Sequence, residues 1–145
     1  MEVLLMQLDF ENLNLDELSL GLSAYGLNCV TDEGGDLIVS NDEMPISQVV
    51  RLSSERKEIT IFSYYPFKTD VSVLDGVNFL NRANSGAYIT KFFLIGESPE
   101  CVVYGSRVNF CPGVVDLNQL AVDIKRASFD MRDLIQADAE DLFFE

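Results

Sequence analysis

Side chains able to do chemistry are scarce in this sequence, and the most restrictive absence is that of histidine. None of the 145 residues is a histidine, which excludes a Ser-His-Asp triad, a Cys-His dyad and any histidine-ligated metal site. The phosphate-binding loop motifs GxxxxGKS, GxxxxGKT and GxGxxG do not occur either. The 24 acidic residues include no pair that stands out as a catalytic acid and base, because acids occur throughout the chain. We therefore expect no enzymatic activity, no cofactor and no metal.

One acidic segment, Asp32-Glu33-Gly34-Gly35-Asp36, resembles an ion-binding loop at first sight. An EF-hand loop needs oxygen ligands at alternate positions and a glycine at its sixth position. Here the acids do not alternate, and the sixth residue counted from Asp32 is Leu37. Acids and glycines between two β-rich runs are typical of a hairpin turn. The segment is therefore predicted to be a turn and not a calcium site.

The three cysteines, Cys29, Cys101 and Cys111, are odd in number and lie at wide, unrelated spacings. This pattern predicts buried free thiols in a reducing compartment. Cys111 is the one candidate for a reactive thiol, because Arg107 and the start of a predicted helix lie close to it in sequence. An isolated thiol is more often a small core residue, and that interpretation is preferred here.

Length and charge limit the possible classes of protein. A chain of 145 residues predicts one domain, and a hydrophobic fraction of 48% excludes general disorder. The net charge is −14, and the first 50 residues contain ten acids and no lysine or arginine. Such a surface disfavours binding to nucleic acids and to anionic membranes. The charge therefore indicates either high solubility or attraction to a basic partner. The N-terminal residues lack the basic start of a secretory signal, and we expect a cytoplasmic protein.

Periodicity and turn signals predict the elements of the first half of the chain. A helix is predicted over Asn14–Tyr25, with Asn14 as its N-cap and Gly26 at its end. Two hairpins are predicted next. In the first, two β-rich runs flank a polar turn, and in the second, apolar and polar residues alternate along the later strand. Their strands are predicted at Leu27–Thr31, Asp36–Ser40, Ile46–Leu52 and Glu58–Tyr65.

The second half repeats the pattern of helix and hairpin. A helix is predicted over Ser72–Asn84, followed by paired strands at Ala87–Ile95 and Cys101–Val108. Asn109–Val115 is predicted to be a loop because it contains Pro112-Gly113. A long final helix begins at Asp116, whose position three residues before Gln119 is typical of a capping box.

The predicted order α-ββ-ββ-α-ββ-α favours an α+β fold, with helices packed on one face of an antiparallel sheet. We expect a single domain over residues 1–145, with a core at about 14–137. The acidic tail from Ala137 is expected to fray, at least over residues 138–145.

The segment around Asn78, Asn81 and Asn84 is unusual, because asparagine is a mediocre helix former. These amides could satisfy backbone groups at the end of the helix or in the next strand, or they could face a partner or a second subunit together with Arg82. The structural role is favoured, and the second role stays open.

Several of these features together resemble the YbjN-like family, which is described as bacterial sensory transduction regulators. They are the Asn78-to-Asn81 pattern at the end of a helix, the hairpin from Ala87 to Val108, the Pro112–Val114 loop and the long closing helix. The resemblance implies a fold similar to that of type III secretion chaperones, an acidic cytoplasmic protein and no known catalysis. It supplies no active-site residues.

Three functions are therefore considered. The first is a non-enzymatic regulatory or chaperone-like protein that acts by binding another protein. The second is a dedicated type III secretion chaperone for one effector, and the third is a small-molecule sensor. A homodimer is expected, with the second predicted helix and the Cys101–Val108 strand in contact. The candidate partner or dimer contacts are Asn78, Asn81, Arg82, Asn84, Val102 and Tyr104.

Overall fold

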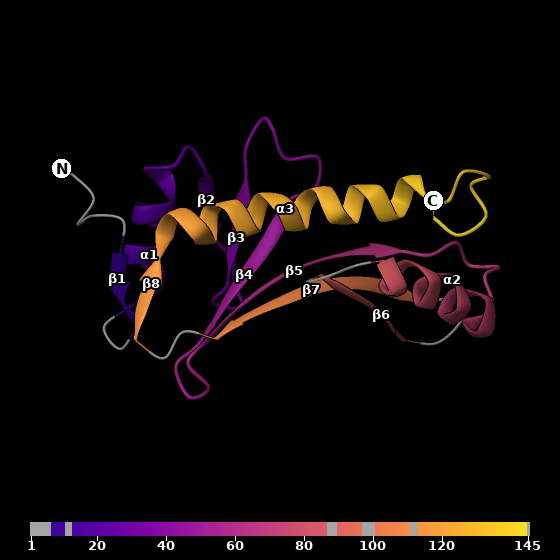
Figure 1. Ribbon diagram of the computed structural model, residues 1–145, viewed down its shortest axis with the longest axis horizontal. Coiled ribbons are helices and arrows are strands. Elements are labelled where there is room, and N and C mark those ends of the chain that lie inside the picture. The colour runs from indigo at the N-terminus through magenta and orange to yellow at the C-terminus, as the bar shows by residue number, and fades with distance from the viewer. Residues whose placement is uncertain (1–6, 11–12, 87–89, 97–100, 111–112, 145) are drawn as a thin grey trace.

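The computed structural model describes residues 7–10, 13–86, 90–96, 101–110 and 113–144, which fold into three helices and eight strands (Figure 1). The helices are α1 (Leu15–Ser23), α2 (Val73–Gly86) and α3 (Leu117–Gln136). The strands are β1 (Gln7–Asp9), β2 (Asn28–Thr31), β3 (Leu37–Ser40), β4 (Gln48–Ser53), β5 (Glu58–Pro66), β6 (Lys91–Ile95), β7 (Val102–Phe110) and β8 (Val114–Asp116).

Six strands form one antiparallel sheet in the order β2-β3-β4-β5-β7-β6. The predicted α+β class and the predicted hairpins are confirmed. Two short strands were not expected: β1 lies before the predicted core, and β8 lies in the predicted loop. They pair with each other through Leu8 and Val115 as a separate two-stranded sheet. The predicted strand start at Ala87 lies outside the described residues.

Local side-chain hydrogen bonds set the helix starts and the first turn as the sequence predicts. The side chain of Asn14 accepts the N–H of Glu17 at 2.8 Å, and that of Asp116 accepts the N–H of Gln119 at 3.1 Å. Gly26 follows α1 with φ +80°, a conformation that glycine adopts without strain. In the β2–β3 turn, the Asp32 carboxylate accepts the N–H of Asp36 at 2.9 Å, so this acid has a structural role there.

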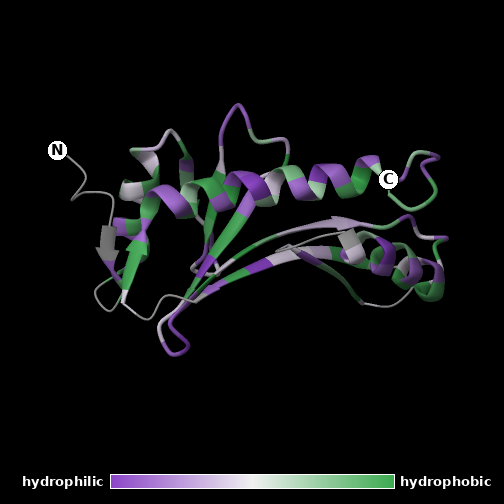
Figure 2. Ribbon diagram, viewed as in Figure 1, coloured by the Kyte–Doolittle hydropathy of each residue, from purple (hydrophilic) through white to green (hydrophobic). Residues whose placement is uncertain are grey.

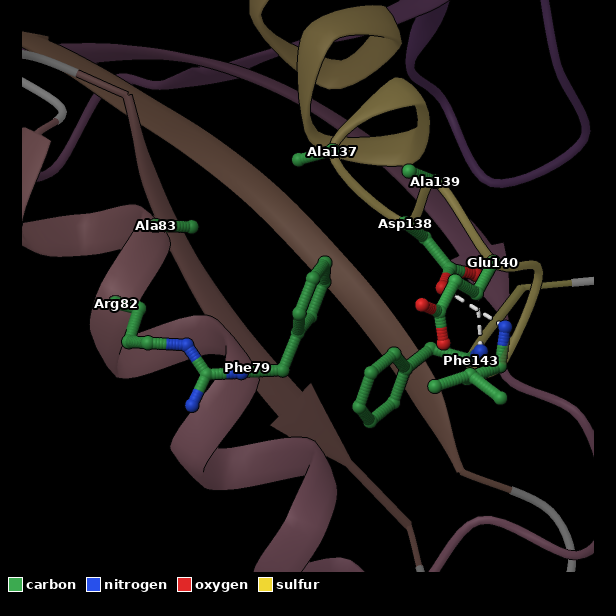
Figure 3. A pocket seen from close by; sticks show the side chains of 9 residues that line it. Phe79, Arg82, Ala83, Ala137, Asp138, Ala139, Glu140 and Phe143 are labelled. Carbon is green, nitrogen blue, oxygen red and sulfur yellow. Dashed lines mark hydrogen bonds between the residues drawn. The ribbon is translucent and has the colours of Figure 1, made fainter.

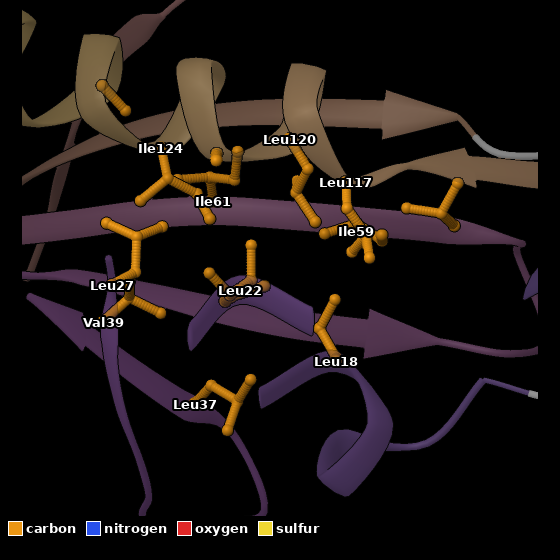
Figure 4. Close-up of a cluster of buried hydrophobic side chains, with 14 of the residues drawn as sticks. Leu18, Leu22, Leu27, Leu37, Val39, Ile59, Ile61, Leu117, Leu120 and Ile124 are labelled. Carbon is orange, nitrogen blue, oxygen red and sulfur yellow. The ribbon is translucent and has the colours of Figure 1, made fainter. Parts of the chain in front are cut away.

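A first cluster of buried apolar side chains lies between the sheet, α1 and the first half of α3 (Figure 4). It exists because side chains alternate along each strand, so Ile59 and Ile61 of β5 both point to the same face. α3 supplies Leu120 and Ile124 to this cluster, and α1 supplies Leu22. Hydrophobic and hydrophilic residues alternate along α3, as expected of a helix with one side on a sheet (Figure 2).

A second buried cluster lies between α2, the sheet and the far half of α3. α2 contributes Phe79 and Leu80, and α3 contributes Met131 and Leu134. Both helices therefore lie on the same face of the sheet, and α3 takes part in both clusters.

Phe143 and Phe144 of the C-terminal segment also belong to the second cluster, which contradicts the fraying expected for this segment. Phe144 is 3% exposed and forms an isolated bridge with Phe67. The carboxylate of Asp138 accepts the backbone N–H groups of Leu142, Phe143 and Phe144 at 2.8, 2.9 and 3.0 Å. Asp138 therefore holds a turn in place, a role that composition alone does not reveal.

This turn predicts a pH dependence of stability. Burial alone would raise the pKa of Asp138, but the three N–H groups and the nearby Lys68 hold that pKa below its usual value. A lowered pKa in the folded state stabilises the fold above the unfolded pKa of about 3.9. This contribution is lost as the pH falls through the folded pKa.

We expect Asp138→Asn to lower the free energy of unfolding by roughly 1 kcal/mol at neutral pH, because charged acceptors are lost. The difference from wild type should shrink as the pH falls below about 4. Urea unfolding followed by circular dichroism at a series of pH values measures this difference in stability. Asp70→Asn, at an exposed position, is the control. A difference between wild type and Asp138→Asn that does not change with pH would contradict the assigned role.

Candidate functional site

A network of charged and polar side chains lies under α3 and is the first place to examine for chemistry. Arg107 is 3% exposed and Asp123 is 9% exposed; their side chains pair at 3.3 Å. Arg107 also donates to the backbone carbonyl of Asp123 at 3.1 Å. The amides of Asn109 and Gln119 donate to the two carboxylate oxygens of Asp123 at 3.1 and 3.0 Å. Both oxygens are engaged, so the network joins β7 to α3 and is not arranged for acid–base catalysis.

A pocket of about 460 Å³ opens between α2 and the end of the chain (Figure 3). Its walls are mainly apolar, and the rings of Phe79 and Phe143 stack at 4.5 Å. Arg82 and Glu140 also line it, together with Asp138, whose carboxylate is already bonded to the backbone. The polar side chains therefore do not converge on one point, as a small-molecule sensor would require.

The six predicted contact residues divide between α2 and the sheet. Asn78, Asn81 and Arg82 are exposed on α2. Asn84 instead bonds to both the N–H and the carbonyl of Phe92, each at 2.8 Å, and so satisfies backbone groups of the edge strand β6. Its structural role is thereby shown.

Val102 and Tyr104, the remaining two, lie on the side of the sheet that faces away from α3. We call this side the open face. By the alternation and register of the strands it includes Val30, Ile38, Val49, Arg51, Thr60, Phe62, Tyr64, Lys91, Phe93, Ile95, Val102, Tyr104, Ser106 and Val108. Six of the twelve exposed large apolar side chains recorded for the described residues belong to it.

Four aromatic rings form the centre of the open face. Tyr104 stacks on Tyr64 at 5.4 Å, on Phe93 at 5.7 Å and on Phe62 at 6.1 Å between ring centroids. The interplanar angles of 19–29° make the rings nearly parallel across β5, β7 and β6. We call these four residues the ring cluster. Tyr64 is 56% exposed and Phe93 is 42% exposed, so the cluster presents its rings to solvent.

One cation already lies on this cluster. The guanidinium carbon of Arg51 is 5.0 Å from the centroid of the Phe62 ring, within the range of a cation–π contact. The same guanidinium makes a forked pair with Asp36, whose oxygens lie at 2.8–3.2 Å from it. The side-chain hydrogen bond with Asp36 raises the pKa of Arg51 above its usual value.

Neither of the two thiols in the described part of the chain is arranged for reactivity. Cys101 is buried, as expected, whereas Cys29 is only half-buried, which corrects the prediction for that residue. Burial raises the pKa of Cys29 and so disfavours its thiolate. Cys111, the one candidate reactive thiol, lies outside the described residues.

Within the described ranges, no three Cys, Asp or Glu side chains form a group that could hold a metal ion. Over the same ranges, no helix has the length and apolar character needed to cross a membrane.

No protein-family model matches the chain, and no curated protein matches it in sequence. Among solved structures it matches the "Crystal structure of YbjN, a putative transcription regulator from E. coli". The TM-score is 0.73, and the match covers 92% of this chain and 97% of that chain at 17% sequence identity. The chain has the fold of YbjN. The resemblance stated from the sequence is thereby confirmed for the fold.

On this YbjN-like fold, sequence reasoning names Tyr104 and Val102 as candidates but does not predict the cluster to which Tyr104 belongs. The alternation of Phe62 and Tyr64 with buried residues of β5 was visible in the sequence. Periodicity does not say whether the second face of a strand is covered, because that depends on where the helices pack. Only the tertiary arrangement shows that α2 and α3 share one face and leave the ring cluster exposed.

Proposed function

We propose that this protein is a non-enzymatic regulatory protein that acts by binding another protein through the open face. The observation that supports this is the ring cluster, which is exposed on a sheet whose helices pack on its other side. Clustered exposed apolar side chains are uncommon on soluble monomers and are typical of interaction sites. Aromatic side chains are also enriched at the centres of protein interfaces.

The proposal is tested by co-purification from the native source with a tagged protein. We expect wild type to recover a stoichiometric partner and the double variant Tyr64→Ser, Phe93→Ser to lose it. Leu20→Ser and Leu142→Ser are the controls, since these leucines are 76% and 57% exposed but lie outside the open face. Equal recovery by the open-face variant, or no partner for wild type under several growth conditions, would overturn the proposal.

The sequence leads us to expect a homodimer with the second helix and the Cys101–Val108 strand in contact, and we propose that it forms through α2 alone. Its outer side exposes Val73, Leu74 and Val77, which are 44%, 69% and 37% exposed. Asn78 and Asn81 are exposed on the same helix. This arrangement would leave the open face available to the partner.

Light scattering at micromolar concentration tests the dimer. Wild type should have the mass of a dimer, and Leu74→Glu should have that of a monomer because a charge would be buried. Leu20→Glu, a comparable change on α1, should stay dimeric. A monomeric wild type would refute the dimer.

A dedicated secretion chaperone in the cytoplasm is the second candidate. It is favoured by the length of the open face, whose outward apolar row Val30–Ile38–Val49–Phe62 continues into the ring cluster. Such a surface suits an extended client segment. An isolated locus, with no neighbouring gene for an effector, would count against it.

A further inference from the structure

The open face also indicates what kind of partner segment it fits, an inference that rests on the proposed function. We propose that the ring cluster binds a cationic protein segment in which arginine side chains stack on Tyr64, Tyr104 and Phe93. Three independent features of the molecule lead to this choice of occupant.

The first feature is the contact that Arg51 makes with Phe62. It shows that a guanidinium fits over a ring of this face at 5.0 Å, with a carboxylate beside it at 2.8 Å. The ring of Phe62 already contacts a cation of the same chain, Arg51, whereas Tyr64 and Phe93 expose their rings to solvent. Arginine in a partner would repeat the same contact on these rings.

The second feature is the ring geometry. Three stacked pairs centred on Tyr104 give a nearly parallel set of rings across three neighbouring strands. A planar guanidinium has a flat face that matches such a surface, whereas an ammonium group is compact and strongly hydrated. The geometry therefore favours arginine over lysine.

The third feature is charge. The whole chain has a net charge of −14, which attracts cations and repels anions at long range. On the open face itself Arg51 and Lys91 are balanced by Glu58 and by Asp36, which pairs with Arg51, so the long-range attraction comes from the rest of the chain. A nucleic acid is disfavoured by the net charge, and a second copy of this chain is proposed to dock on α2, away from this face.

The probe is a short fluorescent peptide in which arginine alternates with valine. Matched peptides have lysine or glutamine in place of arginine. Fluorescence anisotropy with the full-length protein measures their affinities. We expect the arginine peptide to bind more tightly than the lysine peptide and about tenfold more tightly than the glutamine peptide, with binding that weakens as salt is added.

Tyr104→Leu tests the ring cluster directly, because leucine keeps an apolar side chain and removes the ring. We expect it to weaken binding of the arginine peptide about fivefold. Phe129→Leu is the matched control: its ring on α3 also has an arginine, Arg132, at 4.8 Å, but it lies off the open face. It should bind the peptide as wild type does.

Equal binding of the arginine and glutamine peptides would overturn the proposed cationic partner. The proposed function would then still be decided by co-purification with the Tyr64→Ser, Phe93→Ser variant. Dissociation of a wild-type dimer by Tyr104→Leu would show that a second copy covers the face, which would also overturn the proposal. Tighter binding of a single-stranded oligonucleotide than of the arginine peptide would have the same consequence.

Discussion

Replacing Asp123 by alanine is expected to lower the free energy of unfolding by about 3–5 kcal/mol, because it leaves a buried guanidinium without its counter-charge. Arg107 is 3% exposed and forms a salt bridge with Asp123 at 3.3 Å. The change also removes the acceptor of the Gln119 and Asn109 amides. Urea unfolding followed by circular dichroism measures the loss.

Two further variants separate the buried pair from ordinary surface charge. Asp133→Ala on the same helix removes an exposed partner of Arg132 and should cost about 0.5 kcal/mol. The double variant Arg107→Met, Asp123→Leu should be close to wild type in stability, since apolar residues of similar size can replace a buried ion pair. A loss for Asp123→Ala no greater than that for Asp133→Ala would mean that the pair is not buried in solution.

The second large effect is expected at the end of the chain. Phe144→Ala should lower the free energy of unfolding by about 3 kcal/mol, the lower part of the range for buried phenylalanine. Phe144 lies against the rings of Phe67, Tyr65 and Phe79, with centroid distances of 5.1, 5.7 and 6.0 Å. Its removal leaves a cavity in the second cluster.

Leu142→Ala is the control for this change, because Leu142 is close in sequence and 57% exposed. It should alter the free energy of unfolding by less than about 0.5 kcal/mol. Hydrogen exchange should show faster opening of residues 138–144 in Phe144→Ala than in Leu142→Ala. Equal stabilities of the two variants would contradict the packed position of the C-terminal segment.

The parts of the fold that sequence predicts well are those fixed by neighbours in the chain. Asn14 and Asp116 start helices because each accepts an N–H three residues ahead. The β2–β3 turn is formed by Asp32 bonding to Asp36, again within a few residues. Such signals can be recognised in the sequence before any tertiary contact is known.

The parts that sequence misses depend on partners far away in the chain. Leu8 pairs with Val115, and strands of three residues contain too few positions to show a period. Phe144 is buried by Phe67, so the acidic composition of the tail gives no indication that it docks. The ring cluster is missed for the same reason, since Phe62 and Tyr104 meet only when β5 and β7 pair.

The position of α3 has a consequence for how the chain folds as it is synthesised. α3 is the last helix along the sequence, and it supplies side chains to both buried clusters. Neither cluster can therefore close until residues 117–136 have been translated, although most of the sheet precedes them. Translation proceeds at about 5–20 residues per second, so the apolar faces of β3, β4 and β5 stay uncovered for several seconds before α3 is synthesised. During that interval the part of the sheet that α3 covers is exposed on both faces, and this is when a ribosome-associated chaperone would be of most use.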